Sequence, residues 1–413
     1  MRSLPSLAMR RVAYWALVLL VLIATIVVSV AVSDEGEGRD AGARRTAPVP
    51  AATAPAETTA GAGAADQPAA DADGATPLAL VLVRRRGGLP QRWVERIARS
   101  RRVEAVTKVS RAQRLVVRTA SHTGRTVRRV RSGYAIPLDA LVIDPAAYAR
   151  MVPAGDAAAV RRLRSGRVLL STSSARLRGV GEGGRLTLAG GRTVRVAGVV
   201  SDEAARDAEV VFSGADVPAA ERAAAQLLVA AEDADAVDAL VPDDRLTVVA
   251  PLLTGAASAR GGIVRTLQVK ERFGEFAVRL PYGADWIEID PAWRARWLVT
   301  RRVPILGSVT CHRALIAPLR SALRDLQRRG LARLIDPGDY AGCYAPRRIP
   351  GSGTLSLHAW GLAVDVNASE NPQGARPKQD RRVVAAFERA GFTWGGRWPT
   401  APDGMHFELH ERP

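Results

Sequence analysis

The sequence predicts an α+β protein in three parts: a single N-terminal transmembrane helix, an α+β middle domain, and a C-terminal domain with a small antiparallel sheet flanked by helices. Three observations predict this class. An uncharged apolar segment lies near the start, short apolar strand-like runs begin at Leu78, and amphipathic helical patterns alternate with strand patterns in the last third. A chain of 413 residues is long enough for two ordinary domains and their tails.

The N-terminal segment predicts a membrane anchor. Residues 1–12 form a basic tail, and residues 13–32 contain no charged side chain. At about 1.5 Å per residue, such a helix spans a hydrocarbon core about 30 Å thick. The basic tail is expected in the cytoplasm, which places the rest of the chain outside the cytoplasm. A secretory signal has a shorter apolar core of about 7–15 residues, so we expect an uncleaved anchor. Small residues from Ser29 to Ser33 leave a cleaved signal as the alternative.

The next segment, residues 33–77, consists mostly of Ala, Pro, Gly, Thr and acidic residues. It has few large apolar side chains to offset the entropy lost on ordering, so we expect a disordered linker. The whole chain carries a net charge of +18, and only three of its 59 basic residues are lysine. Aromatic residues make up 5%, and no nucleic-acid-binding motif is present, so no nucleic-acid partner is predicted.

Residues 78–254 are expected to form the α+β extracytoplasmic middle domain. The stretch "GRLTLAGGRTVRVAGVV" places Gly190 and Gly191 between two alternating segments, which predicts a β-hairpin. Ala-rich helices are expected around 218–226 and 232–240. The longer run "LLSTSSARLRGVGEGGRLTLAGGRTVRVAGVVSD" resembles the extracytoplasmic domain of ABC-transporter permeases. The region has no cluster of His, Cys or carboxylates that suggests chemistry, so a binding or spacer role is expected, with a possible membrane-protein partner.

The chain has two cysteines, Cys311 and Cys343. In an oxidising compartment, such a pair is most simply a disulfide, with two unpaired buried thiols as the alternative. No C-x-x-C spacing is present, so a zinc site built on cysteine is not expected.

The residues that could support catalysis lie in residues 262–413. In "SLHAWGLAVDVN", a strand would place Asp365 on one face, and a bend at Gly361 could bring His358 beside it. In "PDGMHFELH", a second strand would carry His406, with Asp403 three residues ahead. Two histidines and one carboxylate are a common catalytic zinc set that leaves a position for water. Ordinary hydrogen-bonded histidines are the alternative interpretation. A further carboxylate can act as the base, and Asp403 is the candidate.

The joint pattern S-x-H-x-x-G-x-A-x-D followed by D-x-x-H resembles the zinc peptidases that act on bacterial cell-wall peptides. This family includes D-alanyl-D-alanine carboxypeptidases and dipeptidases and L-alanyl-D-glutamate endopeptidases. The segments "YAGCYAPR" and "AGFTWGGRW" strengthen the resemblance, which covers residues 262–411.

The resemblance implies a role for each matching residue. His358, Asp365 and His406 would bind Zn²⁺, and Asp403 would be the general base, at a position where several relatives have Glu. Ser356 would bind substrate or orient the histidine. An arginine before the S-x-H motif would contact the scissile carbonyl or the substrate carboxylate. Arg347 fits this role best, and Arg348 is the competitor. Glu408 and His410 are rivals for the base and ligand roles.

The sequence thus predicts a membrane-anchored, extracytoplasmic zinc peptidase of the D-alanyl-D-alanine carboxypeptidase type, acting on peptidoglycan stem peptides. Cleavage of the L-Ala-D-Glu bond by an endopeptidase is the alternative within the enzyme class. A wall-binding or regulatory module without turnover is the alternative outside that class.

Overall fold

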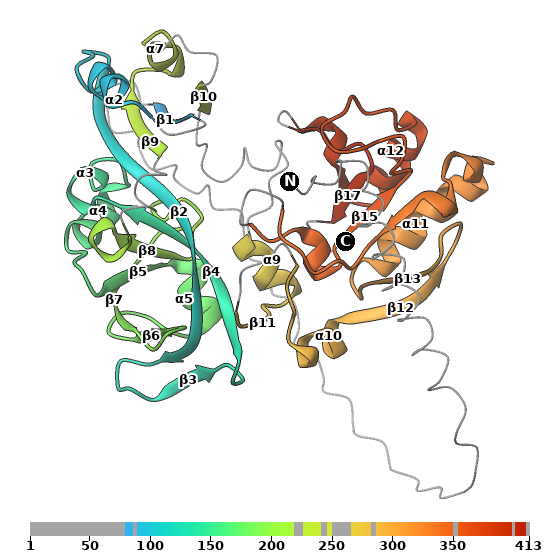
Figure 1. Cartoon of the computed structure of the whole chain (residues 1–413), viewed down its shortest axis with the longest axis horizontal. Helices are drawn as coiled ribbons and strands as arrows, with labels where there is room; N and C mark the ends of the chain where they lie inside the picture. The colour runs from blue at the N-terminus through green and yellow to red at the C-terminus, as the bar shows by residue number, and fades with distance from the viewer. Residues whose placement is uncertain are drawn as a thin grey trace, which may run out of the picture. The chain divides into compact units, whose positions relative to one another are not determined.

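The computed structural model describes residues 79–85, 89–218, 226–240, 246–249, 266–281, 286–349, 354–398 and 401–409 (Figure 1). All of them belong to one compact unit, residues 73–413. The predicted anchor, 13–32, and the predicted linker, 33–77, lie outside the described residues.

The predicted fold class needs correction. None of the helices in the described part of the chain could cross a membrane. The longest of them, α11 (Ile316–Arg328), has 13 residues, about 20 Å at the usual rise, and it carries several arginines. The expected α+β arrangement headed by a transmembrane helix is therefore not what the structure shows. Its largest feature is a mixed sheet that closes on itself.

This sheet has eleven strands. They are β1 (Ala79–Arg85), β2 (Val103–Ala120), β3 (Thr126–Arg129), β4 (Tyr134–Ile143), β5 (Arg167–Ser171), β6 (Arg185–Leu188), β7 (Thr193–Val200), β8 (Val210–Ser213), β9 (Gln226–Ala231), β10 (Leu246–Val249) and β11 (Val278–Arg279). Six of them follow the order β2-β6-β7-β5-β8-β4, and a further pairing of β4 with β2 closes the ring. The pairs β4–β8 and β5–β7 are parallel, while the other pairs in the ring are antiparallel.

The predicted hairpin is present as β6 and β7, which pair antiparallel. Gly190 and Gly191 both have positive φ, at 89° and 87°. Glycine adopts this backbone conformation without steric cost, which explains the pair of glycines in the turn. The predicted helix at 232–240 corresponds to α7 (Ala234–Asp238). Most of the other predicted helix, residues 219–225, lies outside the described residues, and Gln226 begins β9.

Four short helices and one 3₁₀ turn accompany these strands. They are α2 (Gln91–Ala98), α3 (Pro145–Tyr148), α4 (Ala154–Arg161), α5 (Thr172–Arg178) and η1 (Gly214–Asp216). Two further elements, α9 (Thr266–Phe273) and α10 (Pro291–Trp297), precede the last part of the chain.

A buried ion-pair cluster joins α9 and Glu275, two residues after its end, to the middle sheet. Lys270 Nζ lies 2.6 Å from Glu209 Oε1, and Arg178 pairs with both Glu209 and Glu275. All four side chains are at most 2% exposed. Strand β11 adds to the same sheet by pairing with β4.

The last part of the chain is built on a hairpin and a second sheet. The hairpin comprises β12 (Leu298–Val303) and β13 (Gly307–His312). The sheet has the antiparallel order β14-β15-β17-β16. Its strands are β14 (Tyr340–Gly342), β15 (Ala363–Val366), β16 (Phe392–Trp394) and β17 (His406–Leu409). The remaining elements are α12 (Arg381–Arg389), η2 (Ala332–Leu334), η3 (Pro337–Asp339), η4 (Leu357–Trp360) and η5 (Gly395–Arg397).

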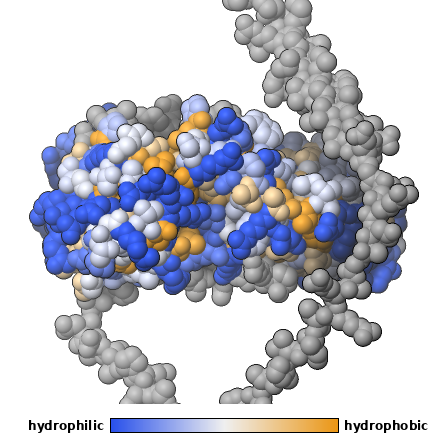
Figure 2. Space-filling model, turned by 90° about the horizontal axis from the view of Figure 1, so that it is seen from below, coloured by the Kyte–Doolittle hydropathy of each residue, from blue (hydrophilic) through white to orange (hydrophobic). Residues whose placement is uncertain are grey.

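One face of this sheet packs on two helices. Val364 of β15 and Phe407 of β17 share a buried core with Leu323 of α11 and Phe387 of α12. Because side chains alternate along a strand, Asp365 and His406 point to the other face. The surface in Figure 2 is mostly hydrophilic, with hydrophobic residues in scattered patches, which fits a net charge of +18.

Candidate metal centre

Strands β15 and β17 bring Asp365 and His406 together. The two residues are direct partners in the antiparallel ladder, so their side chains project from the same face. Nδ1 of His406 lies 3.0 Å from Oδ1 of Asp365. Both side chains are buried.

His358 reaches the same point from η4, the 3₁₀ turn that precedes β15. Gly361 ends this turn in the left-handed conformation, with φ 68°, and it reverses the chain into the strand. A Cβ at this position would lie 2.7 Å from the backbone nitrogen of His312, so a side chain would collide there. Nε2 of His358 lies 3.1 Å from Oδ2 of Asp365 and 3.2 Å from Nδ1 of His406. The bend predicted at Gly361 is confirmed.

Each histidine uses its other ring nitrogen for an outward hydrogen bond. Nδ1 of His358 donates to the carbonyl oxygen of Cys343 at 2.8 Å. Nε2 of His406 donates to Oε2 of Glu408 at 3.0 Å. These bonds fix the ring tautomers, so the neutral rings present lone pairs to each other and to Asp365.

Such an arrangement of lone pairs and a carboxylate requires a cation between the groups, either a proton or a metal ion. Burial opposes charge on His406, but hydrogen bonds to Asp365 and Glu408 outweigh it and raise its pKa to about 10. Burial likewise opposes charge on Asp365, yet His358 and His406 hold the pKa of this carboxyl below its ordinary value. Ligand atoms of His358, Asp365 and His406 all lie within 4.8 Å of one another, so the three residues fit a metal ion.

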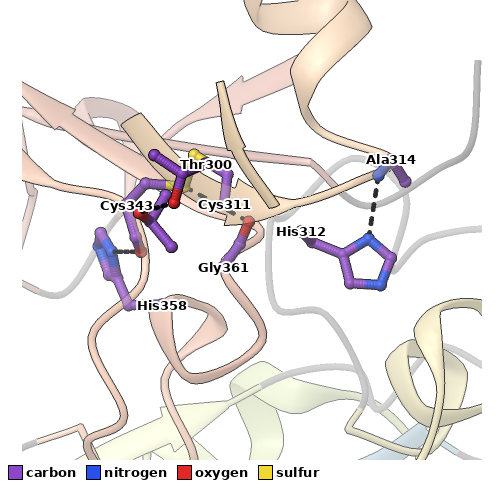
Figure 3. Close-up of a disulfide and its surroundings, with 8 residues drawn as sticks. Thr300, Cys311, His312, Ala314, Cys343, His358 and Gly361 are labelled. Carbon is purple, nitrogen blue, oxygen red and sulfur yellow. Dashed lines mark hydrogen bonds between the residues drawn. A yellow bond between two sulfur atoms is a disulfide. The ribbon is translucent and has the colours of Figure 1, made fainter. Parts of the chain in front are cut away.

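The disulfide predicted from the sequence is present and supports this site (Figure 3). Cys311 in β13 is bonded to Cys343, with their Cα atoms 5.5 Å apart. Figure 3 shows the imidazole of His358 directed at the Cys343 carbonyl, next to the disulfide. The backbone group that orients a candidate metal ligand is therefore held by a covalent link.

Asp403 lies beside the three candidate ligands. It is buried, and its Oδ1 has no hydrogen-bond partner among the described residues. Burial raises the pKa of Asp403, and the negative charge of Asp365 adds to this shift. Interactions with His406, His358 and Arg347 act in the opposite direction. A buried carboxylate with a free oxygen and a raised pKa can take up and release a proton.

The comparison with protein families decides what this region resembles. Residues 350–409 match the family model described as D-alanyl-D-alanine carboxypeptidase. The matched segment contains His358, Asp365, Asp403 and His406, and it confirms the resemblance predicted for the end of the chain.

Two solved structures are similar to part of this carboxypeptidase-like chain. One is the extracellular domain of the noncanonic ABC-type transporter YknZ from Gram-positive bacteria. It has 10% identity and a TM-score of 0.27, and the match covers 41% of this chain and 99% of that one. The other is the periplasmic region of MacB from Actinobacillus actinomycetemcomitans. It has 10% identity and a TM-score of 0.26, and the match covers 45% of this chain and 94% of that one. At these TM-scores, the likeness carries no argument about function.

Arg347 and Arg348, the two candidate arginines, point to opposite sides of their segment. Arg348 forms an antiparallel bridge with Leu355, which is buried in the core, so Arg348 points to the core side of its segment. Arg347 points to the opposite side, and its charge acts on the carboxyl group of Asp403.

Ser356 and His312 have structural contacts. The hydroxyl of Ser356 accepts a hydrogen bond from the backbone nitrogen of His358 at 3.3 Å, so it caps the turn that carries this ligand. His312 is buried, accepts from the nitrogen of Ala314 and donates to the carbonyl of Phe273. His410 lies outside the described residues.

The structure adds two contacts that sequence reasoning did not assign. Glu408 is the hydrogen-bond partner of His406 rather than a member of the ligand group. Its place two residues after His406 on a strand was the available signal, because residues at this spacing share a face. The carbonyl of Cys343 had no such signal, since any residue type carries one.

Proposed function

We propose that this chain is an extracytoplasmic zinc peptidase that hydrolyses peptide bonds in peptidoglycan stem peptides, of the D-alanyl-D-alanine carboxypeptidase type. One observation carries the proposal. A buried group of two histidines and an aspartate lies next to a carboxylate with a free oxygen, within the segment that matches that family.

His358, Asp365 and His406 would hold the zinc ion through Nε2, a carboxylate oxygen and Nδ1. Two nitrogen ligands and one oxygen ligand are typical of catalytic zinc sites. A zinc ion bound there would supply Lewis acidity, polarising the scissile carbonyl and lowering the pKa of water.

Asp403 supplies the proton transfers. Its free Oδ1 accepts a proton from the attacking water and returns it to the nitrogen of the departing amine. A carboxyl group in this position can hold the proton between the two steps.

Arg347 stabilises negative charge on the substrate. Its guanidinium is always charged, and its charge acts on the carboxyl group of Asp403. It would bond the carbonyl oxygen as charge develops there, or the terminal carboxylate of a carboxypeptidase substrate.

The disulfide supports an extracytoplasmic location, because disulfides persist in oxidising compartments. The buried ion pairs between α9 and the middle sheet support a spacer role for residues 78–254, since they tie that region to the chain leading into the catalytic part.

The test uses the full chain loaded with zinc and incubated with defined muropeptides, with products read by mass spectrometry. Loss of a terminal D-alanine establishes the carboxypeptidase, whereas an internal cut establishes an endopeptidase. Asp403→Asn is the control, and we expect it to keep zinc and lose about 10²–10⁴-fold in turnover. A zinc-loaded protein that forms no product from free or cross-linked stems would instead be a binding module.

A further inference from the structure

Trp286 has the most exposed of the large hydrophobic side chains in the described part of the chain, at 63%. Trp293 and Trp360 are buried in the neighbouring core. Ile349 is also exposed, at 40%. A single exposed apolar side chain is ordinary, whereas exposed apolar side chains that share one face can mark a binding site.

The backbone places both side chains beside Arg347. Trp286 and Arg347 are partners in an antiparallel bridge, and the adjacent bond runs from the nitrogen of Ile287 to the carbonyl of Pro346 at 2.9 Å. This pattern makes Trp286 and Arg347 a non-hydrogen-bonded pair, the type whose side chains come closest on a shared face. Ile349 is two residues beyond Arg347 and therefore projects from the same face.

The backbone of this segment is already paired along both edges. Pro346 accepts from Ile287 on one side. On the other side, Arg347 accepts from the nitrogen of Ser356 at 3.1 Å, and the nitrogen of Ile349 donates to Thr354 at 2.8 Å. A substrate peptide therefore cannot add to the segment as another strand, and any recognition there must use side chains.

The same segment borders the candidate metal centre. The nitrogen of Ala345 donates to the carbonyl of His358 at 3.0 Å, and the charge of Arg347 acts on Asp403. A ligand that contacts Arg347 during hydrolysis thus lies close to the face that carries Trp286 and Ile349.

We propose that Trp286 and Ile349 form an apolar shelf that binds an aliphatic side chain of the substrate peptide, one residue before the two residues joined by the bond that is hydrolysed. This inference rests on the proposed function. The two apolar side chains offer a surface that several methylene groups can cover, and burying such area stabilises the complex. The shelf thereby selects peptides with a long aliphatic side chain over those with a methyl group at the same position.

The test compares two peptides on the zinc-loaded full chain: diacetyl-L-lysyl-D-alanyl-D-alanine and acetyl-L-alanyl-D-alanyl-D-alanine. Trp286→Ala should raise KM for the lysyl peptide about tenfold, with kcat nearly unchanged and little effect on the alanyl peptide. Trp286→Phe should return KM for the lysyl peptide most of the way to the wild-type value. Val199→Ala, which trims another exposed apolar side chain, is the matched control and should change neither peptide. Equal effects of Trp286→Ala on both peptides, or no effect on either, would overturn the proposal.

A binding measurement separates this proposal from the proposed function. Calorimetric titration of the lysyl peptide into Asp403→Asn, with and without Trp286→Ala, needs no turnover. A loss of affinity of about tenfold supports the shelf even if the protein hydrolyses neither peptide. Equal affinity in the two proteins rejects the shelf even if hydrolysis is observed. If Trp286→Ala weakens only ligands that carry the muramoyl disaccharide, the occupant is a sugar and the assignment to a peptide side chain is wrong.

Discussion

The carbonyl oxygen of Cys343 accepts the Nδ1 proton of His358 over 2.8 Å, so one residue both forms the disulfide and orients a candidate metal ligand. The disulfide thereby restrains the Cys343 carbonyl, which is hydrogen-bonded to a candidate metal ligand. Hydrogen-bond partners of this kind fix the tautomer and the direction of the imidazole.

Replacing both cysteines, as in Cys311→Ser with Cys343→Ser, should weaken zinc binding. The carbonyl remains in the double variant, but its position is no longer held by a covalent link. We expect the zinc dissociation constant to rise about tenfold, the low end of what removing such a partner costs. Competition with a chelator measures it. A variant that melts at a lower temperature but binds zinc as tightly as the wild type would contradict this account of the disulfide.

Glu408 should matter for zinc affinity through His406. Glu408→Leu removes the acceptor for Nε2 of His406 and should weaken zinc binding by about 10–100-fold. Glu408→Gln keeps an acceptor oxygen and should lose less zinc affinity than Glu408→Leu. Glu388→Gln, which alters a surface pair with Arg397, is the matched control and should leave zinc affinity unchanged. Should Glu408→Leu bind zinc normally, the tautomer of His406 is set by something other than Glu408.

The two adjacent arginines should differ sharply in kinetics. Arg347→Lys should lower kcat/KM by about 10²–10³-fold, because it removes a planar donor aimed at developing charge. Arg348→Lys should stay close to the wild type, since Arg348 points toward the core side with Leu355. Steady-state kinetics of the two variants with a single peptide measure this difference in kcat/KM. The reverse order of effects would reassign the role to Arg348.

The buried ion-pair cluster predicts how stability depends on pH. Burial opposes charge on Glu209, but Lys270 and Arg178 outweigh it and hold its pKa below the ordinary value. A carboxyl with a lowered folded pKa stabilises the fold above the unfolded pKa, about 4.3, and this contribution is lost as pH falls further. In urea unfolding, Glu209 should contribute little to any change in the free energy of unfolding between pH 7 and 5. Below about pH 4, the free energy of unfolding should fall as the stabilising contribution of Glu209 is lost.

Glu209→Gln tests the same cluster at neutral pH. It leaves Lys270 and Arg178 buried with less negative charge to balance theirs. The free energy of unfolding should fall by about 3–5 kcal/mol. Glu182→Gln changes an exposed carboxylate and serves as the control. A variant at position 209 that is as stable as the control would mean that the cluster is solvated.

Local spacing was sufficient to predict that His358, Asp365 and His406 lie together. His358, Gly361 and Asp365 lie within eight residues, and the turn and strand that join them follow from glycine and alternating apolar residues. His406 begins the neighbouring strand β17, and Asp403 lies in the turn three residues before it. Patterns of this length are encoded almost entirely by adjacent residues.

Features that depend on distant segments were not predictable in this way. The closing of the middle sheet depends on the pairing of β2 with β4 and on two parallel pairs, and no local pattern specifies these partners. The carbonyl of Cys343 and the placement of Trp286 beside Arg347 depend equally on backbone pairing across many residues. The expected transmembrane helix came from composition alone, and it is absent from the described part of the fold.

The central claim is that His358, Asp365 and His406 hold a zinc ion. Zinc-edge X-ray absorption on the zinc-loaded full chain tests it most directly. We expect one zinc per chain, with imidazole scattering from two histidines at about 2.0–2.1 Å. His358→Ala should lose one imidazole, and Asp365→Ala should lose most of the metal. Zinc that is absent, or bound without imidazole ligands, would contradict the account.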